Sequence, residues 1–534
     1  MTNKTLKNSL VYLSLLLFPV LVSAQEKGID QRIDEAFKPI ADWWGWLIFY
    51  PIYDGIPLVL VLLIFGAAFF TVAFGFVNIT KFWLAINVVR GKYDDIEHAD
   101  ADSHAEVNVV DGDIVDTIKD ESHHGEVSHF QALATAVSGT VGLGNIAGVA
   151  VAIAIGGPGA TFWMIVCGLL GMSSKFVECT LGVKYRDIDA DGTVHGGPMY
   201  YLSRGFKDLG FAGVGKVFGV FFAIMCVGGS FGGGNAFQAN QATAQITGMF
   251  GLEGGAVKTI IGVILAVLTG IVIIGGIKRI ANVTEKLVPL MAIIYIIASL
   301  IIILAHFSEI PAAISIIISS AFTPAATVGG IMGVILQGFK RAAFSNEAGA
   351  GSAAIAHSAV KTKYPASEGI VALLEPFIDT VVICTLTAVV IVLFNMDGFF
   401  AYGGQGGNVL INGVAVNGVE LTSRAYNDVL PGFSYILTIA IVLFAFSTMI
   451  SWSYYGLQSW KYLFGRSNVA DITYKILFLI FVVIGSAASL QSVIDFSDAM
   501  IFAMVFPNMI GLFFLFPKVK EELNRYLEVI KRKG

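Results

Sequence analysis

The sequence predicts an all-α protein that crosses a lipid bilayer many times. Of its 534 residues, 56% are hydrophobic and only 13% are charged, and the mean hydropathy is +0.76. Runs that are nearly free of charge exceed the roughly 18 residues that mark a membrane span. A large soluble enzyme would need far more charge on its surface, and a β-barrel would show alternating segments of about ten residues.

Residues 1–24 have the pattern of a secretory signal peptide. Two lysines precede the apolar run LVYLSLLLFPVLV, and Val22-Ser23-Ala24 resembles a cleavage site with small residues. An uncleaved first helix is the alternative. Residues 25–55 predict a periplasmic, interfacial helix, because apolar residues recur at helical spacing and three tryptophans follow them.

The hydropathy pattern predicts eleven spans after the signal peptide. An extra transmembrane helix comes first, in the segment 56–90, and a charged insertion follows it. Two groups of five helices, at 129–306 and 326–517, are joined by an extracellular connection at 307–325 and followed by a basic tail at 518–534. The predicted spans lie at about 56–77, 129–155, 158–183, 213–247, 256–275, 285–306, 326–356, 367–395, 431–459, 470–491 and 496–517.

Two long loops differ in composition. Residues 91–128 are acidic and contain several histidines, but no cysteine or ordered ligand spacing accompanies them. We therefore interpret this insertion as a solvated cytoplasmic loop, with metal binding as the alternative. The loop from about Met396 to Val429 is rich in Gly and Asn, and its segment INGVAVNGV predicts a small hairpin.

Basic residues gather in alternate loops and in the C-terminal tail. The positive-inside rule places these segments in the cytoplasm. Eleven spans that begin outside end inside, which agrees with signal cleavage. We therefore expect a bacterial inner-membrane protein with a periplasmic N-terminus and a cytoplasmic C-terminus. The basic loop residues are Lys278, Arg279, Lys286, Lys361, Lys363, Lys461 and Arg466.

The segment GTVGLGNIAG, residues 139–148, contains a G-x-G-x-x-A spacing that can mark a dinucleotide-binding turn. Such a turn needs a strand before it and an acidic residue about twenty residues later. The helix-like ALATAVS precedes it here and the apolar FWMIVCGLLG follows, which excludes that function. Instead, the glycines predict a break in a membrane helix, which is tolerated where it lines a cavity.

A second glycine-rich interruption, SNEAGAGS, occupies residues 345–352 within another apolar span. Paired interruptions at matching positions of two halves predict an inverted-repeat transporter with its binding site near the membrane midplane. Broken helices offer free N–H groups to an anion and free carbonyls to a cation. Close helix packing through small residues is the alternative.

Polar side chains inside the predicted spans indicate a functional or structural role, because placing them in lipid costs free energy. Gln238 lies on one face with Asn235 and Gln241, and Thr448 and Trp452 share another face at i and i+4. Hydroxyl and carbonyl oxygens suit a small hard cation such as Na⁺. Structural pairing is expected for most of the charged residues in spans, which are Lys175, Glu178, Lys340, Arg341, Glu347, Glu375 and Asp379.

Several long blocks make residues 50–517 resemble the alanine or glycine:cation symporter family, the sodium:alanine symporters. These blocks are SHFQALATAVSGTVGLGNIAG, GGPGATFWM with GMSSKFVE, GGPMYY, GFKRAAFSNEAGAGSAAIAH, FIDTVVICT and FSTMISWSYYG. The resemblance implies a leucine-transporter-like five-plus-five inverted repeat with one extra N-terminal helix. It also implies Na⁺-driven uptake of a small neutral amino acid, and no enzymatic activity.

The resemblance also implies site residues. Na⁺ would lie between carbonyls of the first broken helix, at Gly139, and the hydroxyl of Ser447 or Thr448. Leu143 and Gln337 depart from the family pattern, which predicts a wider pocket and leaves the exact amino acid open. The substrate contacts carried over by motif are Thr140, Gly142, Gly144, Asn145, Gln238, Gln337, Gly338, Phe339, Thr448 and Trp452.

The sequence also bears on functions other than transport. Aromatic closure at Phe339 and Trp452 argues against a channel, which needs a continuous polar pore. A membrane enzyme would need a converging nucleophile or metal set, and the sequence predicts none. A non-transporting amino-acid sensor, or a symporter with a different amino acid or coupling ion, would keep the same site. The expected partners are the bilayer, Na⁺ and the amino acid, with no nucleic acid; the sequence carries no signal for an oligomeric state.

Overall fold

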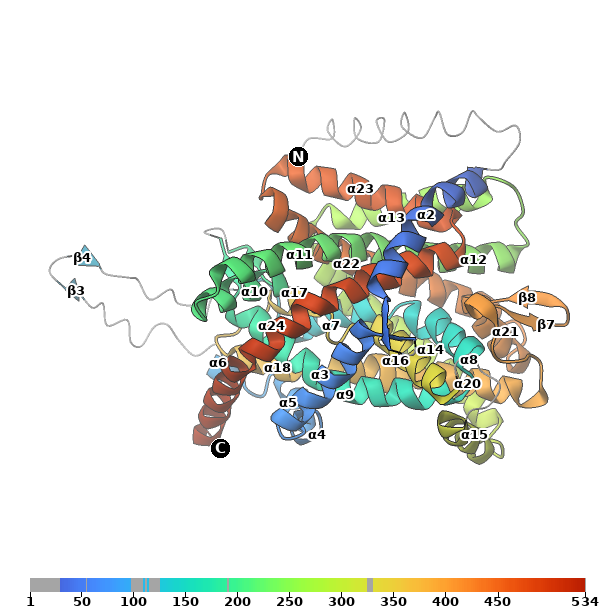
Figure 1. Cartoon of the computed structure of the whole chain (residues 1–534), viewed down its shortest axis with the longest axis horizontal. Coiled ribbons are helices and arrows are strands. Elements are labelled where there is room, and N and C mark those ends of the chain that lie inside the picture. Colours follow the sequence, from blue (N-terminus) through green and yellow to red (C-terminus); the bar gives the residue numbers. More distant parts are fainter. Residues whose placement is uncertain are drawn as a thin grey trace.

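The computed structural model describes residues 29–53, 55–97, 109–110, 113–114, 125–189, 192–323 and 330–533. Most of the long helices run along the longest axis of the molecule and pack side by side (Figure 1). The predicted signal peptide and most of the acidic insertion lie outside the described residues. The predicted interfacial segment contains a helix, α2, and its Trp44 indole N–H contacts the Met500 sulfur at 2.6 Å.

Helices make up most of the described part of the first half. They and the short strands between them are α2 (Ile29–Ile48), β1 (Pro51–Tyr53), β2 (Ile56–Pro57), α3 (Leu58–Ala73), α4 (Val77–Thr80), α5 (Phe82–Val89), α6 (Asp94–Glu97), β3 (Val109–Val110), β4 (Asp113–Ile114), α7 (His129–Thr140), the π-helical turn η2 (Gly144–Gly148), α8 (Val149–Gly156), α9 (Gly159–Lys184), β5 (Asp187–Ile188), β6 (Val194–His195), α10 (Pro198–Asp208), α11 (Ala212–Phe231), the π-helical turn η3 (Gly232–Ala236), α12 (Phe237–Phe250), α13 (Val257–Ile273) and α14 (Gly276–Ala305).

The second half has the same character. Its elements are α15 (Ile310–Phe322), α16 (Gly330–Asn346), α17 (Ala353–His357), α18 (Pro365–Ala372), α19 (Leu374–Pro376), the π-helical segment η4 (Phe377–Cys384), α20 (Thr385–Phe394), the 3₁₀ turns η5 (Asn395–Asp397) and η6 (Gln405–Gly407), β7 (Val409–Ile411), β8 (Val414–Val416), α21 (Gly418–Val429), α22 (Ser434–Phe464), α23 (Asn468–Ala487) and α24 (Leu490–Lys533).

Seven helical stretches in the described part of the chain are long and apolar enough to cross a membrane, and α7 with Gly144–Gly156, bent by 49°, makes an eighth. This confirms the prediction of a multi-pass helical membrane protein. The count of eleven spans stays a prediction. Two of the expected spans are shorter helices, because α3 has 16 residues and α13 has 17.

Helices also cover segments outside the predicted spans. Lys278, Arg279 and Lys286 were expected in a loop, but they belong to the first turns of α14. The helix extends past its apolar stretch because nothing in that segment stops it. The expected basic tail likewise continues α24 as one helix, with two prolines inside it. The connection at 307–325 contains a helix, α15.

The predicted hairpin in the 396–429 loop is confirmed. Strands β7 and β8 pair antiparallel, with Val409 opposite Val416. The two turn residues, Asn412 and Gly413, have φ values of +53° and +78°. Positive φ at both central residues is the requirement of a type I′ turn, which Asn-Gly meets well.

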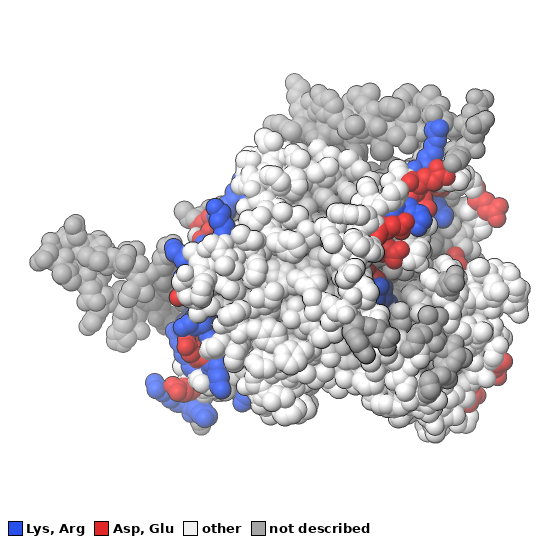
Figure 2. Space-filling model, in the orientation of Figure 1, with Lys and Arg blue, Asp and Glu red and all other residues white. Residues whose placement is uncertain are grey.

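Charge is distributed unevenly along the long axis. Figure 2 shows a broad uncharged middle on this face, with Lys and Arg gathered at the end that carries the C-terminus. An uncharged middle between charged ends is the surface that a bilayer requires. We call the end with the C-terminus the basic end.

Candidate functional site

The first predicted break separates α7 from η2. A capping box starts α7, because the Ser128 side chain accepts from the Gln131 N–H at 3.3 Å and the Gln131 side chain accepts from the Ser128 N–H at 3.2 Å. The helix stops at Thr140. Beyond it, the Gly142 N–H donates to the Asn145 side chain at 2.8 Å. A side-chain oxygen therefore accepts a hydrogen bond from an N–H group that has lost its helical partner at the break.

The second predicted break separates α16 from α17. Asn346 ends α16, and Glu347 follows with a φ of +55°. Gly349 and Gly351 each have a φ of +89°, a conformation that glycine adopts without steric cost. Glu347 has no such freedom, and a non-glycine residue held there costs roughly 1–3 kcal/mol. Both interruptions are therefore real breaks in buried helices.

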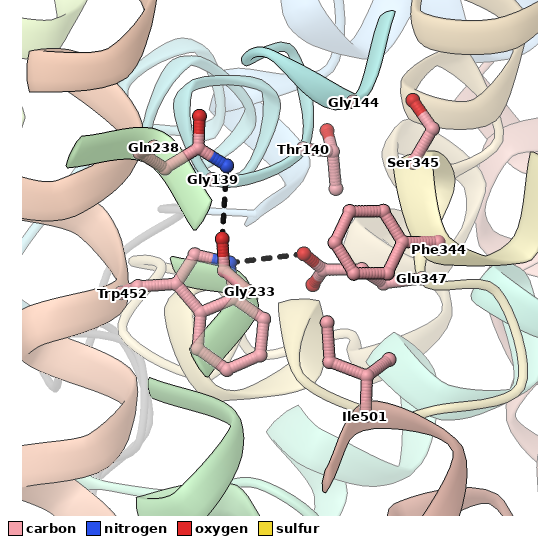
Figure 3. A pocket seen from close by; sticks show the side chains of 10 residues that line it. All are labelled: Gly139, Thr140, Gly144, Gly233, Gln238, Phe344, Ser345, Glu347, Trp452 and Ile501. Carbon is pink, nitrogen blue, oxygen red and sulfur yellow. Dashed lines mark hydrogen bonds between the residues drawn. The ribbon is translucent and has the colours of Figure 1, made fainter. Parts of the chain in front are cut away.

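A small cavity lies between the two breaks (Figure 3). Its volume is about 10 Å³, which admits about one water molecule. Its walls come from α7, η2 and η3, from α12, from α16 and the break after it, and from α22 and α24. The lining residues are Gly139, Thr140, Gly144, Gly233, Gln238, Phe344, Ser345, Glu347, Trp452 and Ile501.

Gln238 links the cavity to the first break. Its Oε1 accepts from the Leu143 N–H at 3.0 Å, and its Nε2 donates to the Gly233 carbonyl at 2.9 Å. Trp452 lies across the cavity and donates its indole N–H to Glu347 Oε1 at 2.9 Å (Figure 3). Glu347 Oε2 accepts from Ser352. Polar groups on both breaks thus face one buried space.

The structure brings part of the predicted substrate set to this cavity. Thr140, Gly144, Gln238 and Trp452 line it, and so does Gly139, which was expected at the cation. Three further predicted residues lie directly behind the wall. A Cβ atom built on Gly142 would lie 2.3 Å from Thr448 Oγ1 and 3.0 Å from Gln238 Oε1. Asn145 caps Gly142 from the other side.

The structure does not bring Gln337, Gly338 and Phe339 to the cavity. A Cβ atom on Gly338 would meet the Ala160 carbonyl of α9 at 2.7 Å, and the Phe339 ring lies 6.2 Å from the Trp163 ring. This part of α16 packs on α9. The cavity instead receives residues one to two turns later, namely Phe344, Ser345 and Glu347. Their place next to the break is the sequence signal that could have identified them.

Ser447 and Thr448, the predicted cation ligands, lie where α22 crosses α7. Thr448 Oγ1 donates to the Ser138 carbonyl at 3.0 Å, and Ser447 Oγ donates to the Phe444 carbonyl at 2.9 Å. Ser138 Oγ donates in turn to the Ser447 carbonyl at 2.8 Å. Hydroxyl and carbonyl oxygens are the donor type that hard cations such as Na⁺ prefer. In the described residues, no group of three or more His, Cys, Asp or Glu side chains has an arrangement for a metal.

Asp379 forms a second oxygen-rich position that sequence reasoning did not assign. It is fully buried, and its Oδ1 accepts from Asn145 Nδ2 at 2.6 Å and from Ser345 Oγ at 3.1 Å. Thr380 Oγ1 donates to Oδ2 at 2.7 Å. Among the described residues, no salt bridge of 4.0 Å or less involves Asp379. A buried carboxylate without a cationic partner, touching both breaks, is a natural position for a cation or a proton.

A chain of buried ionisable residues leads from the centre toward the basic end. Lys175 on α9 pairs with Glu375 at 3.0 Å, and not with Glu178 one turn away on the same helix. Glu178 instead accepts from Asn508 at 2.8 Å. His357 Nε2 lies 3.5 Å from Glu375 Oε2, and its Nδ1 lies 2.5 Å from Glu368 Oε1.

The other oxygen of Glu368 contacts His129 Nδ1. His129 is the first residue of α7 and His357 the last of α17, so one carboxylate joins the two broken helices at their outer ends. We call this the Glu368 bridge. His129 Nε2 also contacts Glu97 Oε2 at 2.7 Å. Burial alone would raise the pKa of Glu97, but the hydrogen bond and charge of His129, with bonds from Tyr526 and Thr362, lower it from the usual 4.5.

Comparison with known proteins identifies the family. A family model described as "Sodium:alanine symporter family" matches residues 48–534. The chain belongs to the sodium:alanine symporter family. This family consists of transporters, so the chain is a multi-pass membrane transporter and not an enzyme.

Several curated relatives resemble the chain over most of its length. It is 37% identical to the sodium/alanine symporter AgcS of Methanococcus maripaludis over 479 residues, which covers 90% of this chain and 96% of that protein. It is 38% identical to the putative sodium/proton-dependent alanine carrier protein YrbD of Bacillus subtilis, covering 75% and 81%. It is 35% identical to the probable sodium/glutamine symporter GlnT of the same organism, covering 75% and 78%.

A solved structure, that of MhsT in complex with L-phenylalanine, aligns with 74% of this chain and 99% of its own. The TM-score is 0.49 and the sequence identity is 15%. A TM-score below 0.5 does not establish a common fold.

Proposed function

We propose that this member of the family imports a small neutral amino acid, alanine or glycine, together with Na⁺ by alternating access. The observation that carries the proposal is the buried cavity between two broken helices, which has polar groups of both breaks in its wall. The architecture we propose is a leucine-transporter-like five-plus-five inverted repeat with one extra N-terminal helix. The protein would lie in the bacterial inner membrane with its basic end in the cytoplasm.

The substrate carboxylate would bind at the first break. The Leu143 N–H now donates to Gln238, and a carboxylate in the cavity would replace that acceptor or share it. A broken helix supports this exchange because its N–H groups are oriented and its dipole favours an anion. A small apolar side chain would pack against Phe344 and Trp452, which line the opposite wall.

Na⁺ would bind beside the cavity, at two candidate positions. One is the crossing of α7 and α22, where Thr448, Ser447 and the carbonyl of Ser138 meet. The other is Asp379, which joins Asn145 and Ser345. Either position touches a break that also forms the cavity wall. A cation there would order the break and raise substrate affinity, and the substrate would raise cation affinity equally.

The small size of the cavity supports alternating access. A volume of about 10 Å³ admits no amino acid, so the walls must separate for substrate to enter or leave. Opening one side at a time would require the helices of one repeat to rock against the other. A sensor that binds the amino acid without transport, or a symporter for a larger amino acid or another ion, would use the same residues.

The test is uptake by the full-length protein in proteoliposomes. Labelled alanine and glycine are offered with an inward Na⁺ gradient, with equal Na⁺ on both sides, and with K⁺ replacing Na⁺. Accumulation above equilibrium only under the gradient supports the proposal. Binding without accumulation would indicate a sensor. If alanine and glycine do not accumulate, labelled glutamine and an inward proton gradient are tried next. Accumulation of glutamine would indicate a different substrate, and accumulation driven by the proton gradient would indicate a different coupling ion.

A further inference from the structure

Among the described residues that line the cavity, Glu347 is the one with a carboxylate. Its side chain enters between the Trp452 indole and the Phe344 ring (Figure 3), and only 2% of its surface is exposed. Its left-handed backbone conformation, with φ at +55°, turns the residue out of the helical path of α16. The break therefore places a carboxylate at a point where a regular helix would not.

The hydrogen-bond partners of Glu347 are both neutral. Trp452 donates to Oε1 at 2.9 Å and Ser352 donates to Oε2. Lys175 attracts Glu347, but its ammonium is hydrogen-bonded to Glu375 at 3.0 Å. Among the described residues, no salt bridge of 4.0 Å or less involves Glu347.

The surroundings of Lys175 contain more negative than positive charge. Lys175 is one ammonium near three buried carboxylates, those of Glu178, Glu347 and Glu375. A carboxylate in a dry interior is costly unless a cation or a proton neutralises it. Glu347 is the member of this group that faces the cavity, so a cation that enters the cavity reaches it first.

We propose that Glu347 receives the ammonium group of the amino acid and thereby selects substrates that carry a charged amine. This inference rests on the proposed function. The carboxylate of the substrate lies at the first break, by Leu143 and Gln238, and its ammonium lies at the second break, against Glu347. Each end of the zwitterion thus meets one broken helix, and the bound substrate neutralises a carboxylate that the protein leaves without a cation.

Glu347→Gln tests this role, because glutamine keeps an acceptor for Trp452 and removes the charge. Binding of L-alanine to the purified full-length protein is measured in saturating Na⁺, beside Glu178→Gln as the matched control. Glu178 is equally buried near Lys175 but lies outside the cavity wall. We expect the Kd for alanine to rise at least 50-fold in Glu347→Gln and less than 3-fold in Glu178→Gln.

A second ligand separates charge recognition from structural damage. Lactate has a hydroxyl where alanine has an ammonium. We expect wild type to prefer alanine over lactate at least 100-fold, and Glu347→Gln to lose most of that preference. If Glu347→Gln does not fold, Glu347→Asp keeps the charge and should retain the preference with weaker binding.

Three outcomes would overturn the inference. Unchanged alanine affinity in Glu347→Gln would do so, as would an unchanged preference over lactate, or equal binding of alanine and lactate by wild type and Glu347→Asp. In those cases gradient-driven uptake by wild type would leave the proposed function intact. If wild type binds no α-amino acid at all, the proposed function fails and this inference fails with it.

Discussion

The hydroxyl of Thr448 donates to the main-chain carbonyl of Ser138 across a distance of 3.0 Å. This bond joins the middle of α22 to the last turn of α7, just before the first break. Both oxygens are buried and uncharged. A cation that binds here would accept these oxygens as ligands in place of the hydrogen bond between them.

Thr448→Val should therefore weaken the response to Na⁺. Valine has the shape of threonine without the hydroxyl, so the change removes one ligand and little packing. We expect the Na⁺ concentration for half-maximal uptake to rise about tenfold, equivalent to ~1.4 kcal/mol. Thr448→Ser keeps the hydroxyl and should stay within threefold of wild type. Equal Na⁺ dependence in all three proteins would show that Thr448 is not a ligand of the cation.

Gly142→Ala should abolish uptake. The added Cβ atom would lie 2.3 Å from Thr448 Oγ1 and 3.0 Å from Gln238 Oε1, so the break, the hydroxyl or the amide must shift. Gly148→Ala is the matched control, because a Cβ atom there meets no atom within 4 Å. We expect uptake below a tenth of wild type for the first variant and above half for the second. Similar rates for both would show that the close approach at Gly142 has no functional role.

Two alanine variants test which phenylalanine of α16 contacts the substrate. The structure places Phe344 in the cavity wall, whereas the motif predicts Phe339. Phe344 lines the cavity and Phe339 packs toward Trp163 of α9. Phe344→Ala should raise the KM for alanine at least tenfold. Phe339→Ala should lower thermal stability, since truncating a buried phenylalanine costs roughly 3–5 kcal/mol, while leaving the KM within threefold. The reverse pattern would restore Phe339 as the substrate contact.

Glu97 should contribute stability that depends on pH. Its pKa in the folded protein is lowered, so its contribution is present above about pH 4.5 and is lost as the pH falls through the folded value. Glu97→Gln should lower the melting temperature at pH 7, because a buried charged hydrogen-bond acceptor is worth roughly 1–3 kcal/mol. The difference from wild type should shrink as the pH is lowered below 4.5. A difference that is constant with pH would contradict this account.

Local sequence predicted the breaks well. Each break is marked by glycines spaced two to four residues apart, which weaken a membrane helix at that point. The hairpin β7–β8 was predicted for the same cause, since Asn-Gly specifies its own turn. These features depend on backbone conformation, which neighbouring residues determine.

Side-chain direction was harder to predict. Phe339 and Phe344 both precede the second break in an apolar helix, and periodicity does not tell which side of a helix surrounded by protein faces a cavity. Long-range pairs were also missed. Lys175 has Glu178 one turn away, yet it pairs with Glu375, 200 residues later. Such choices depend on how distant helices pack, and no local pattern carries that information.

The Glu368 bridge has a consequence for how the two broken helices move. One buried carboxylate, that of Glu368, contacts both His129 of α7 and His357 of α17. Moving either helix end away would therefore remove one partner from a buried charge. Separating one partner of a buried charged contact costs several kcal/mol, so half-separated arrangements are rare. We therefore expect the two helix ends to separate together, as one cooperative unit, rather than one at a time.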